Sequence, residues 1–306
     1  MSRLKRSILR RRRIVPNITT IRRRIGSVRN TKQITKAMEL VSASKMRRAQ
    51  ERALRSRGYS DLAYSLLARL SSLKEVETDP LFKQRMVKDR LYVVMTSNSG
   101  LAGAYNYNVL KQLTLAAQAD QLAGVKTKVI MIGKQGANFI RRLQNINLLA
   151  VYPAFGDNPT ANHLRPILTT VIDQYWNKKT DEVNIIYTKF ISNLTQKVEQ
   201  LSILPAKASE DLDKPAYKYS FTNFEPSVEV VIDSVATRLI DAQIWQATLE
   251  SMASEHSMRM LAMKNASDNA TELIDDLTLE FNTARQASIT QELAEISGGV
   301  EALASN

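Results

Sequence analysis

QITKAMELVSASKMRRAQERALRSR, residues 33–57, decides the fold of this chain of 306 residues. Its apolar residues recur at helical spacing in two neighbouring rows: Ile34, Met38 and Val41, and beside them Ala37 and Leu40. The remaining positions are mainly Ser, Ala and Arg, and no other apolar segment lies nearby in the sequence. A helix of this kind needs a partner from a distant part of the chain.

The distribution of glycine and proline indicates where that partner lies. Between Pro226 and Gly298 there are 71 residues without either, and an unbroken helix of that length spans on the order of 105 Å. Residues 17–57 contain Gly26 and no proline, enough for a helix on the order of 60 Å long. Helices far beyond 25 residues need a partner along their length, so we expect these two to pair.

The spacing of small and apolar residues predicts a coiled coil. In the C-terminal segment the expected seam is Met263, Ala266, Ala270, Leu273, Leu277, Phe281, Ala284 and Ser288. In the N-terminal segment it is Ile21, Ile25, Val28, Thr35, Ser42, Met46, Ala49, Ala53 and Ser56. Seams rich in Ala and Ser predict close packing of slender helices. We therefore expect residues 21–57 and 227–297 to form one antiparallel coiled coil.

The two ends of the chain carry opposite charge. Residues 1–57 hold 19 Lys or Arg and two acidic residues, whereas residues 227–306 hold four Lys or Arg and 13 acidic residues. The net charge of +13 therefore hides a basic helix and an acidic one. Charges of this kind favour one partner and one orientation more than they stabilise the pair.

Between the long helices the sequence alternates strands and helices. Strands are expected at residues 90–96, 128–133 and 148–153, and an antiparallel hairpin at residues 182–190 and 197–205. Helices are expected at residues 105–119, from about residue 134, and at 161–176. The pattern predicts a central open, mainly parallel α/β (Rossmann-like) domain. The expected organisation is a basic extension (1–16), a coiled-coil helix (17–75), the α/β domain (76–222) and a second coiled-coil helix (223–306).

Composition leaves little material for catalysis. The chain has no cysteine and two histidines far apart in sequence, which excludes disulfides, thiol catalysis and cysteine-based zinc sites. Gly100 and Gly103 lie between a strand and a helix, where a phosphate-binding loop would lie, but they form no GxGxxG or GxxxxGK pattern. We interpret them as serving a tight turn. No catalytic residue, cofactor or metal is expected, and no apolar run is long enough to cross a membrane.

Two other classes of function remain as alternatives. A basic coiled-coil protein that binds nucleic acid would account for the arginines of residues 7–15, although residues 1–58 contain no aromatic side chain to stack on bases. A nucleotide-dependent enzyme would account for the sheet but not for 71 residues of unbroken helix.

Three segments, residues 30–50, 96–106 and 257–299, resemble the signature regions of the gamma subunit of F-type ATP synthase, in its bacterial form. The resemblance runs in the same order from about residue 18 to residue 302. It departs from the family in the central segment, where Asn98, Ser99 and Ala102 replace an acidic residue, a basic residue and a cysteine.

The resemblance implies a central rotor shaft that couples transmembrane ion flow to ATP synthesis or hydrolysis, without being catalytic itself. It implies a ring of three alpha and three beta subunits, an epsilon subunit and a membrane rotor ring of c subunits as partners. Neither a nucleic acid nor a small-molecule substrate is implied. The residues that it places against the alpha and beta subunits are Met38, Arg259, Arg285, Gln286, Thr290 and Glu295.

The resemblance also implies a location. We expect a peripheral protein on the cytoplasmic side of a bacterial inner membrane. Because residues 1–17 are rich in arginine and contain no acidic residue, the matrix side of the mitochondrial inner membrane is the alternative.

Overall fold

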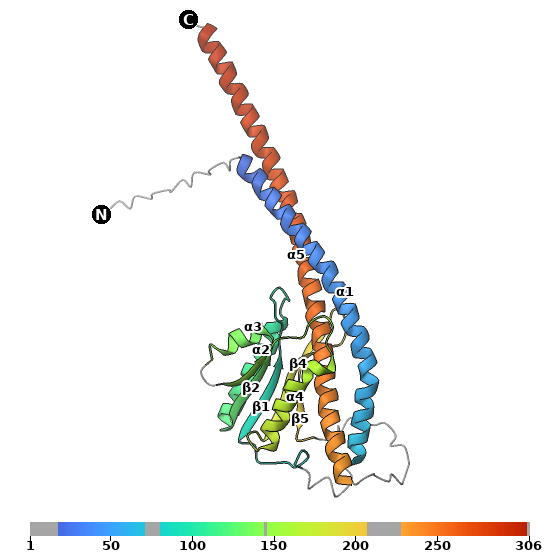
Figure 1. Cartoon of the computed structure of the whole chain (residues 1–306). Helices are drawn as coiled ribbons and strands as arrows, with labels where there is room; N and C mark the ends of the chain where they lie inside the picture. The colour runs from blue at the N-terminus through green and yellow to red at the C-terminus, as the bar shows by residue number, and fades with distance from the viewer. Residues whose placement is uncertain (1–17, 71–79, 144–145, 207–227, 305–306) are drawn as a thin grey trace, which may run out of the picture. The chain divides into compact units, whose positions relative to one another are not determined.

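The computed structural model of the chain describes residues 18–70, 80–143, 146–206 and 228–304 (Figure 1). Its elements are, in order, α1 (Ile18–Leu70), β1 (Asp89–Met95), α2 (Tyr105–Leu122), β2 (Lys126–Ile132), α3 (Lys134–Ile140), β3 (Asn147–Tyr152), α4 (Ala161–Trp176), β4 (Glu182–Phe190), β5 (Gln196–Leu204) and α5 (Val228–Ala304). The expected basic extension, residues 1–16, lies outside the described residues. The chain divides into two compact units, residues 1–38 with 263–306 and residues 39–262.

The second unit contains a five-stranded sheet in the order β3-β2-β1-β4-β5. Strand β1 pairs in parallel with β2 on one side and with β4 on the other, and β2 pairs in parallel with β3. Strands β4 and β5 form an antiparallel hairpin at the edge. The mainly parallel α/β sheet and the edge hairpin expected from the sequence are thus confirmed, with strand ends within two residues of the expected ones.

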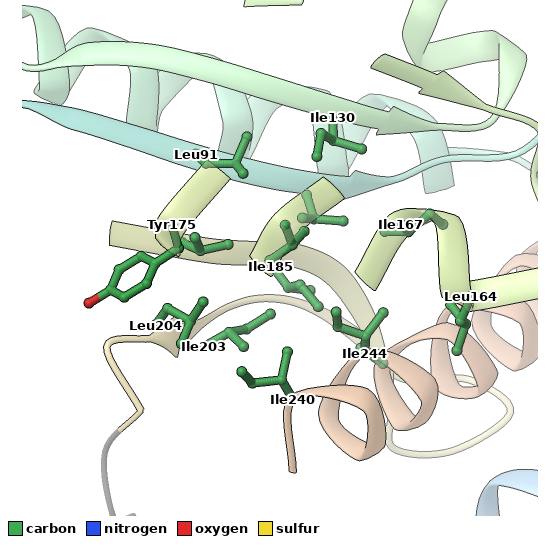
Figure 2. Packing of buried hydrophobic residues seen from close by; sticks show 14 of the residues in the cluster. Leu91, Ile130, Leu164, Ile167, Tyr175, Ile185, Ile203, Leu204, Ile240 and Ile244 are labelled. Carbon is green, nitrogen blue, oxygen red and sulfur yellow. The ribbon is translucent and has the colours of Figure 1, made fainter. Parts of the chain in front are cut away.

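Helices cover both faces of the sheet because its central strands are apolar on both sides. Leu91 and Val93 belong to one buried cluster. Figure 2 shows Leu91 in this cluster with Leu164 of α4 and Ile240 of α5. Tyr92 and its neighbours on the other face pack against α2 and α3. Buried parallel strands of this kind read as continuous apolar runs. Helix α5 is therefore part of the core of the sheet domain as well as a coiled-coil helix.

The turn between β2 and α3 requires glycine. At Gly133, where φ is +99°, an added Cβ would lie 2.2 Å from the carbonyl oxygen of Thr96. The Thr96 hydroxyl donates to the carbonyl of Ile132 at 2.8 Å and accepts from the amide of Gly136 at 3.1 Å. The end of β1 is thereby tied to the first turn of α3.

In the first unit, α1 and α5 pack as the sequence predicts. Ile21 and Ile25 of α1 form a buried cluster with Leu277 and Ala284 of α5. Farther along, small polar side chains line the seam, among them Thr35, which is buried. All of the expected α1 seam residues are buried or half-buried, including those that fall in the second unit. An antiparallel pairing of the two helices is confirmed.

The expected α5 seam was wrong at two positions. Leu273 is 47% exposed, and Ile274 packs into the cluster in its place. Ser267 is buried at 4% exposure, whereas Ala266 is only half-buried. From Met263 to Leu277 the observed seam takes steps of four, three, four and three residues. The expected seam took steps of three, four, three and four residues over the same span. Ala266 and Leu273 belong to the neighbouring row of the helix, which looks equally apolar in the sequence.

Helix α5 lies within the expected residues 223–306, and its paired part is shorter than expected. It continues through Gly298 and Gly299 to Ala304. The glycines make the helix less favourable by about 1 kcal/mol each but do not end it, because neither disrupts the hydrogen-bond ladder as proline does. Among the described residues of α5, Ala284 is the last buried one. The expected pairing up to residue 297 is therefore wrong, because α1 begins only at Ile18.

Candidate functional site

The end of α5 beyond Ala284 is uncovered by the described part of the chain. Between residues 285 and 303, the side chains that the structure describes are all exposed except for that of Ser288, which is half-buried. The exposed set includes five large apolar residues in alternating steps of four and three: Ile289, Leu293, Ile296, Val300 and Leu303. A seam of this kind is the sequence signature of a contact with another helix or protein, and none of the described residues covers it.

Four of the six residues expected at the ring contact lie on this uncovered end. Arg285, Gln286, Thr290 and Glu295 are all exposed. The Thr290 hydroxyl donates to the carbonyl of Gln286 at 2.9 Å, and Gln291 donates to Glu295 at 2.9 Å. These are local contacts one turn apart on the surface of the helix, and all four side chains remain exposed.

Met38 lies on α1 and is half-buried. Near it in the sequence, three large apolar side chains of α1 are more than half exposed: Ile34, Leu40 and Val41. They belong to the rows that first suggested an amphipathic helix. Their exposure shows that the buried face of α1 is the Thr, Ser and Ala seam, so the apolar row in the sequence marks a second surface of the helix.

Arg259 is placed differently from the other five residues. Its side chain is 9% exposed and forms an ion pair with Glu255 at 2.8 Å. The same guanidinium donates to the Ser99 hydroxyl at 3.2 Å. Its partners thus come from its own chain, which the sequence could not show because Ser99 and Arg259 are 160 positions apart.

Basic side chains of α1 hold the loop that follows β3. Lys45 forms an ion pair with Asp157 at 2.9 Å, and Arg52 donates to the carbonyl of Asp157 at 2.5 Å and to the side chain of Asn158. The hydrogen bond from Lys45 lowers the pKa of Asp157 below its usual value. Arg57 reaches Glu250 of α5 at 3.8 Å. The positive charge of α1 is therefore shared between the acidic helix and the sheet domain.

The glycine loop before α2 serves a turn, as expected from the sequence. Gly103 has φ of +55°, and an added Cβ would meet the Met258 carbonyl and the Ala262 side chain of α5 at 3.7 and 3.8 Å. Gly103 thus lies where the loop passes close to α5. Within the described residues no group of acidic and histidine side chains could hold a metal ion, and no helix is both long and apolar enough to span a membrane.

Comparison with known proteins places these surfaces in context. Residues 17–303 match the family model described as ATP synthase. The chain is 42% identical over 291 residues to the ATP synthase gamma chain of Herpetosiphon aurantiacus, covering 92% of this chain and 97% of the relative. It is 38% identical over 284 residues to that of Stenotrophomonas maltophilia, covering 92% and 98%.

Solved structures share the architecture. A chain of the central stalk and c-ring structure of the Tetrahymena thermophila mitochondrial ATP synthase superposes with a TM-score of 0.62 at 25% identity, covering 76% of this chain and 99% of that one. A chain of the Euglena gracilis mitochondrial ATP synthase superposes with a TM-score of 0.65 over 94% of each chain, and at 18% identity this likeness concerns the fold.

Proposed function

The chain belongs to the ATP synthase gamma family, and on that premise we propose how its surfaces meet the other subunits. As a gamma chain it is the central rotor of an F-type ATP synthase. We infer a ring of three alpha and three beta subunits around the coiled coil, with an epsilon subunit and a ring of c subunits as further partners. In this proposal the chain contributes no catalytic residue, and the catalytic sites belong to the ring.

The uncovered end of α5 carries the proposal. A single helix that displays Ile289, Leu293, Ile296, Val300 and Leu303 in coiled-coil spacing needs apolar surroundings from another protein. Arg285, Gln286, Thr290 and Glu295 supply polar contacts around the same turns, and Met38 supplies a contact on α1. The ring contact rests on these five, because Arg259 is engaged within its own chain.

The mechanism follows from asymmetry. A helix pair presents different side chains on each side, so three chemically identical beta subunits around it meet three different surfaces. Each surface stabilises the conformation that binds it best, and with it a different nucleotide affinity. Rotation of the shaft exchanges the three surfaces among the beta subunits. The seam of Ala, Ser and Thr keeps the helix pair slender, and α5 contains no proline that would kink it.

We place the assembled protein at the surface of an energy-converting membrane, on the cytoplasmic side in a bacterium. The similarity to bacterial gamma chains supports this, and a mitochondrial location on the matrix side is the alternative. The similarity over nearly the whole chain is to gamma chains, so it favours neither the nucleic-acid alternative nor the nucleotide enzyme.

Assembly with purified alpha and beta subunits tests the proposal. The full chain should co-elute with them and support steady ATP hydrolysis. The double variant Leu293→Gln/Ile296→Gln should lower hydrolysis, because it removes two apolar contacts. The matched variant Leu279→Gln, at an exposed apolar residue of α5 that lies before this uncovered end, should not. Failure of the wild-type chain to assemble would overturn the proposal.

A further inference from the structure

A buried ion pair on α5 is directed at the loop before α2. Arg259 lies one helical turn after Glu255, and the two pair at 2.8 Å with side chains 9% and 13% exposed. The guanidinium also donates to the Ser99 hydroxyl at 3.2 Å and reaches the Gly100 carbonyl at 3.5 Å. A second nitrogen of the same group lies 3.4 Å from Nδ1 of His256. One side chain thus joins α5 to the loop at residues 97–104.

Hydrogen bonds within the loop fix the backbone at Ser99, and further contacts join the loop to α5. The Ser97 hydroxyl donates to the carbonyl of Ser99 at 2.6 Å, and the Ser97 amide donates to the Asn106 side chain at 3.0 Å. At the far end of the loop the hydroxyls of Tyr105 and Ser251 lie 2.6 Å apart, both buried. With the approach of Gly103 to Ala262, the loop contacts α5 over three turns.

The chemistry of the contact favours arginine. Glu255 is buried, and burial raises the pKa of its carboxyl while the charge of Arg259 opposes that effect. A guanidinium presents donors in a fixed plane, so it binds the carboxylate and still reaches the loop, which the compact ammonium of lysine does less well. Hydrogen bonds of this kind fix a direction, whereas the apolar contacts between α5 and the sheet do not.

We propose that Arg259 is a positioning residue that locks the loop at residues 97–104 to α5, so that the sheet domain turns with the helix. The proposal rests on the proposed function of the chain as a rotor. It gives Arg259 a role inside the rotor, where torque passes between α5 and the sheet domain. Without this contact, the loop moves against α5 when torque acts on the rotor. The connection between the sheet domain and α5 is then less stiff, and the angle between them varies more widely.

Rotation of single assembled complexes tests this. The ring is fixed to a surface and a probe is attached to a cysteine at the exposed position Lys111 of α2, which is unique because the chain has no other. The width of the angular distribution during a catalytic pause gives the torsional stiffness. Arg259→Ala and Ser99→Ala should each lose stiffness, whereas Arg238→Ala, at an exposed arginine of the same helix, should not.

Two further variants separate the lock from the ion pair. The exchange Glu255→Arg/Arg259→Glu keeps opposite charges on α5 but moves the guanidinium away from Ser99. The torsional stiffness of this variant should therefore be as low as that of Arg259→Ala. In a chain with Ser99→Cys and Arg259→Cys, a short bifunctional maleimide should restore stiffness. The probe is then attached to an azide-bearing amino acid introduced at position 111. In the isolated full chain, amides at residues 98–103 should exchange about tenfold faster in Arg259→Ala.

The outcomes are distinct. If Arg259→Ala and Ser99→Ala rotate with wild-type stiffness, or if the cross-link restores nothing, the lock does not exist. If the exchanged pair has wild-type stiffness, the ion pair alone acts and the proposal is wrong. If the wild-type chain neither assembles nor rotates, the proposed function fails, while faster amide exchange in Arg259→Ala would still support the local contact.

Discussion

The hydroxyls of Thr35 on α1 and Ser267 on α5 lie 2.7 Å apart and are buried between the two helices. Thr35 also donates to the carbonyl of Lys32 at 3.0 Å, so Ser267 donates across the seam and Thr35 accepts. A hydrogen bond between small side chains lets the helix backbones approach closely while fixing one register. This contact joins residues 232 positions apart in the sequence.

The Thr35 and Ser267 pair should contribute to stability as a unit. Thr35→Val and Ser267→Ala should each lower the free energy of unfolding by about 1 kcal/mol, because each leaves one polar partner without its cross-helix bond. The double variant should lose less than the sum of the two. Urea unfolding of all four chains measures this coupling, and strictly additive losses would show that the hydroxyls do not interact.

Arg285→Ala should leave the chain folded and assembled but lower the ATP turnover of the complex. Arg285 is exposed on the uncovered end of α5, and alanine is the better helix former. A charged hydrogen bond to the ring contributes about 1.5–3 kcal/mol. ATP turnover should therefore fall by about tenfold to about a hundredfold. Lys264→Ala, at another exposed position of α5, is the control. Equal turnover in wild type and Arg285→Ala would make Arg285 a solvated charge.

The sheet domain should depend strongly on Asp120. This residue has no exposed surface, pairs with Arg90 and accepts hydrogen bonds from Tyr92 at 3.0 Å and Thr127 at 3.2 Å. Asp120→Ala should lower the free energy of unfolding by about 3 kcal/mol, because it leaves a half-buried guanidinium with one partner fewer. Asp173→Ala, at an exposed ion pair on α4, should change it by less than about 1 kcal/mol. Similar losses in the two variants would contradict this account.

Stability should fall in mild acid because of His256. Burial, with the charges of Arg259 and Lys45, lowers the pKa of this imidazole from 6.5 to about 4. Between those values the unfolded chain binds a proton that the folded chain does not. Stability is therefore fully present above about pH 6.5 and is lost as the pH falls toward about 4.

The variant His256→Gln isolates this effect. Between about pH 7 and about pH 5, the free energy of unfolding of the wild type should fall by about 2 kcal/mol more than that of the variant. Denaturant unfolding at the two pH values measures the difference. Parallel pH profiles would show that the imidazole titrates normally in the fold.

Local pattern was sufficient for the elements of this fold but not for their contacts. The helix and strand boundaries followed from periodicity and from glycine and proline, because these act on neighbouring residues. The choice between Leu273 and Ile274 for the seam depends on the direction from which α1 approaches, and two adjacent apolar rows do not encode that direction. The partners of Arg259 were missed because a polar residue on a helix carries no sign of a distant loop.

The shared use of α5 sets the order in which the chain can fold during synthesis. The strands and α4 are complete by Leu204, yet the buried cluster on one sheet face also needs Leu239, Ile240 and Ile244 of α5. A ribosome therefore presents a sheet whose one apolar face is covered by α4 but not yet by α5 until the last quarter of the chain emerges. Helix α1 waits longer still, since the partner of Thr35 is made 232 residues later. Nascent chains stalled before α5 should bind chaperones that recognise exposed apolar surface, and release should follow the synthesis of α5.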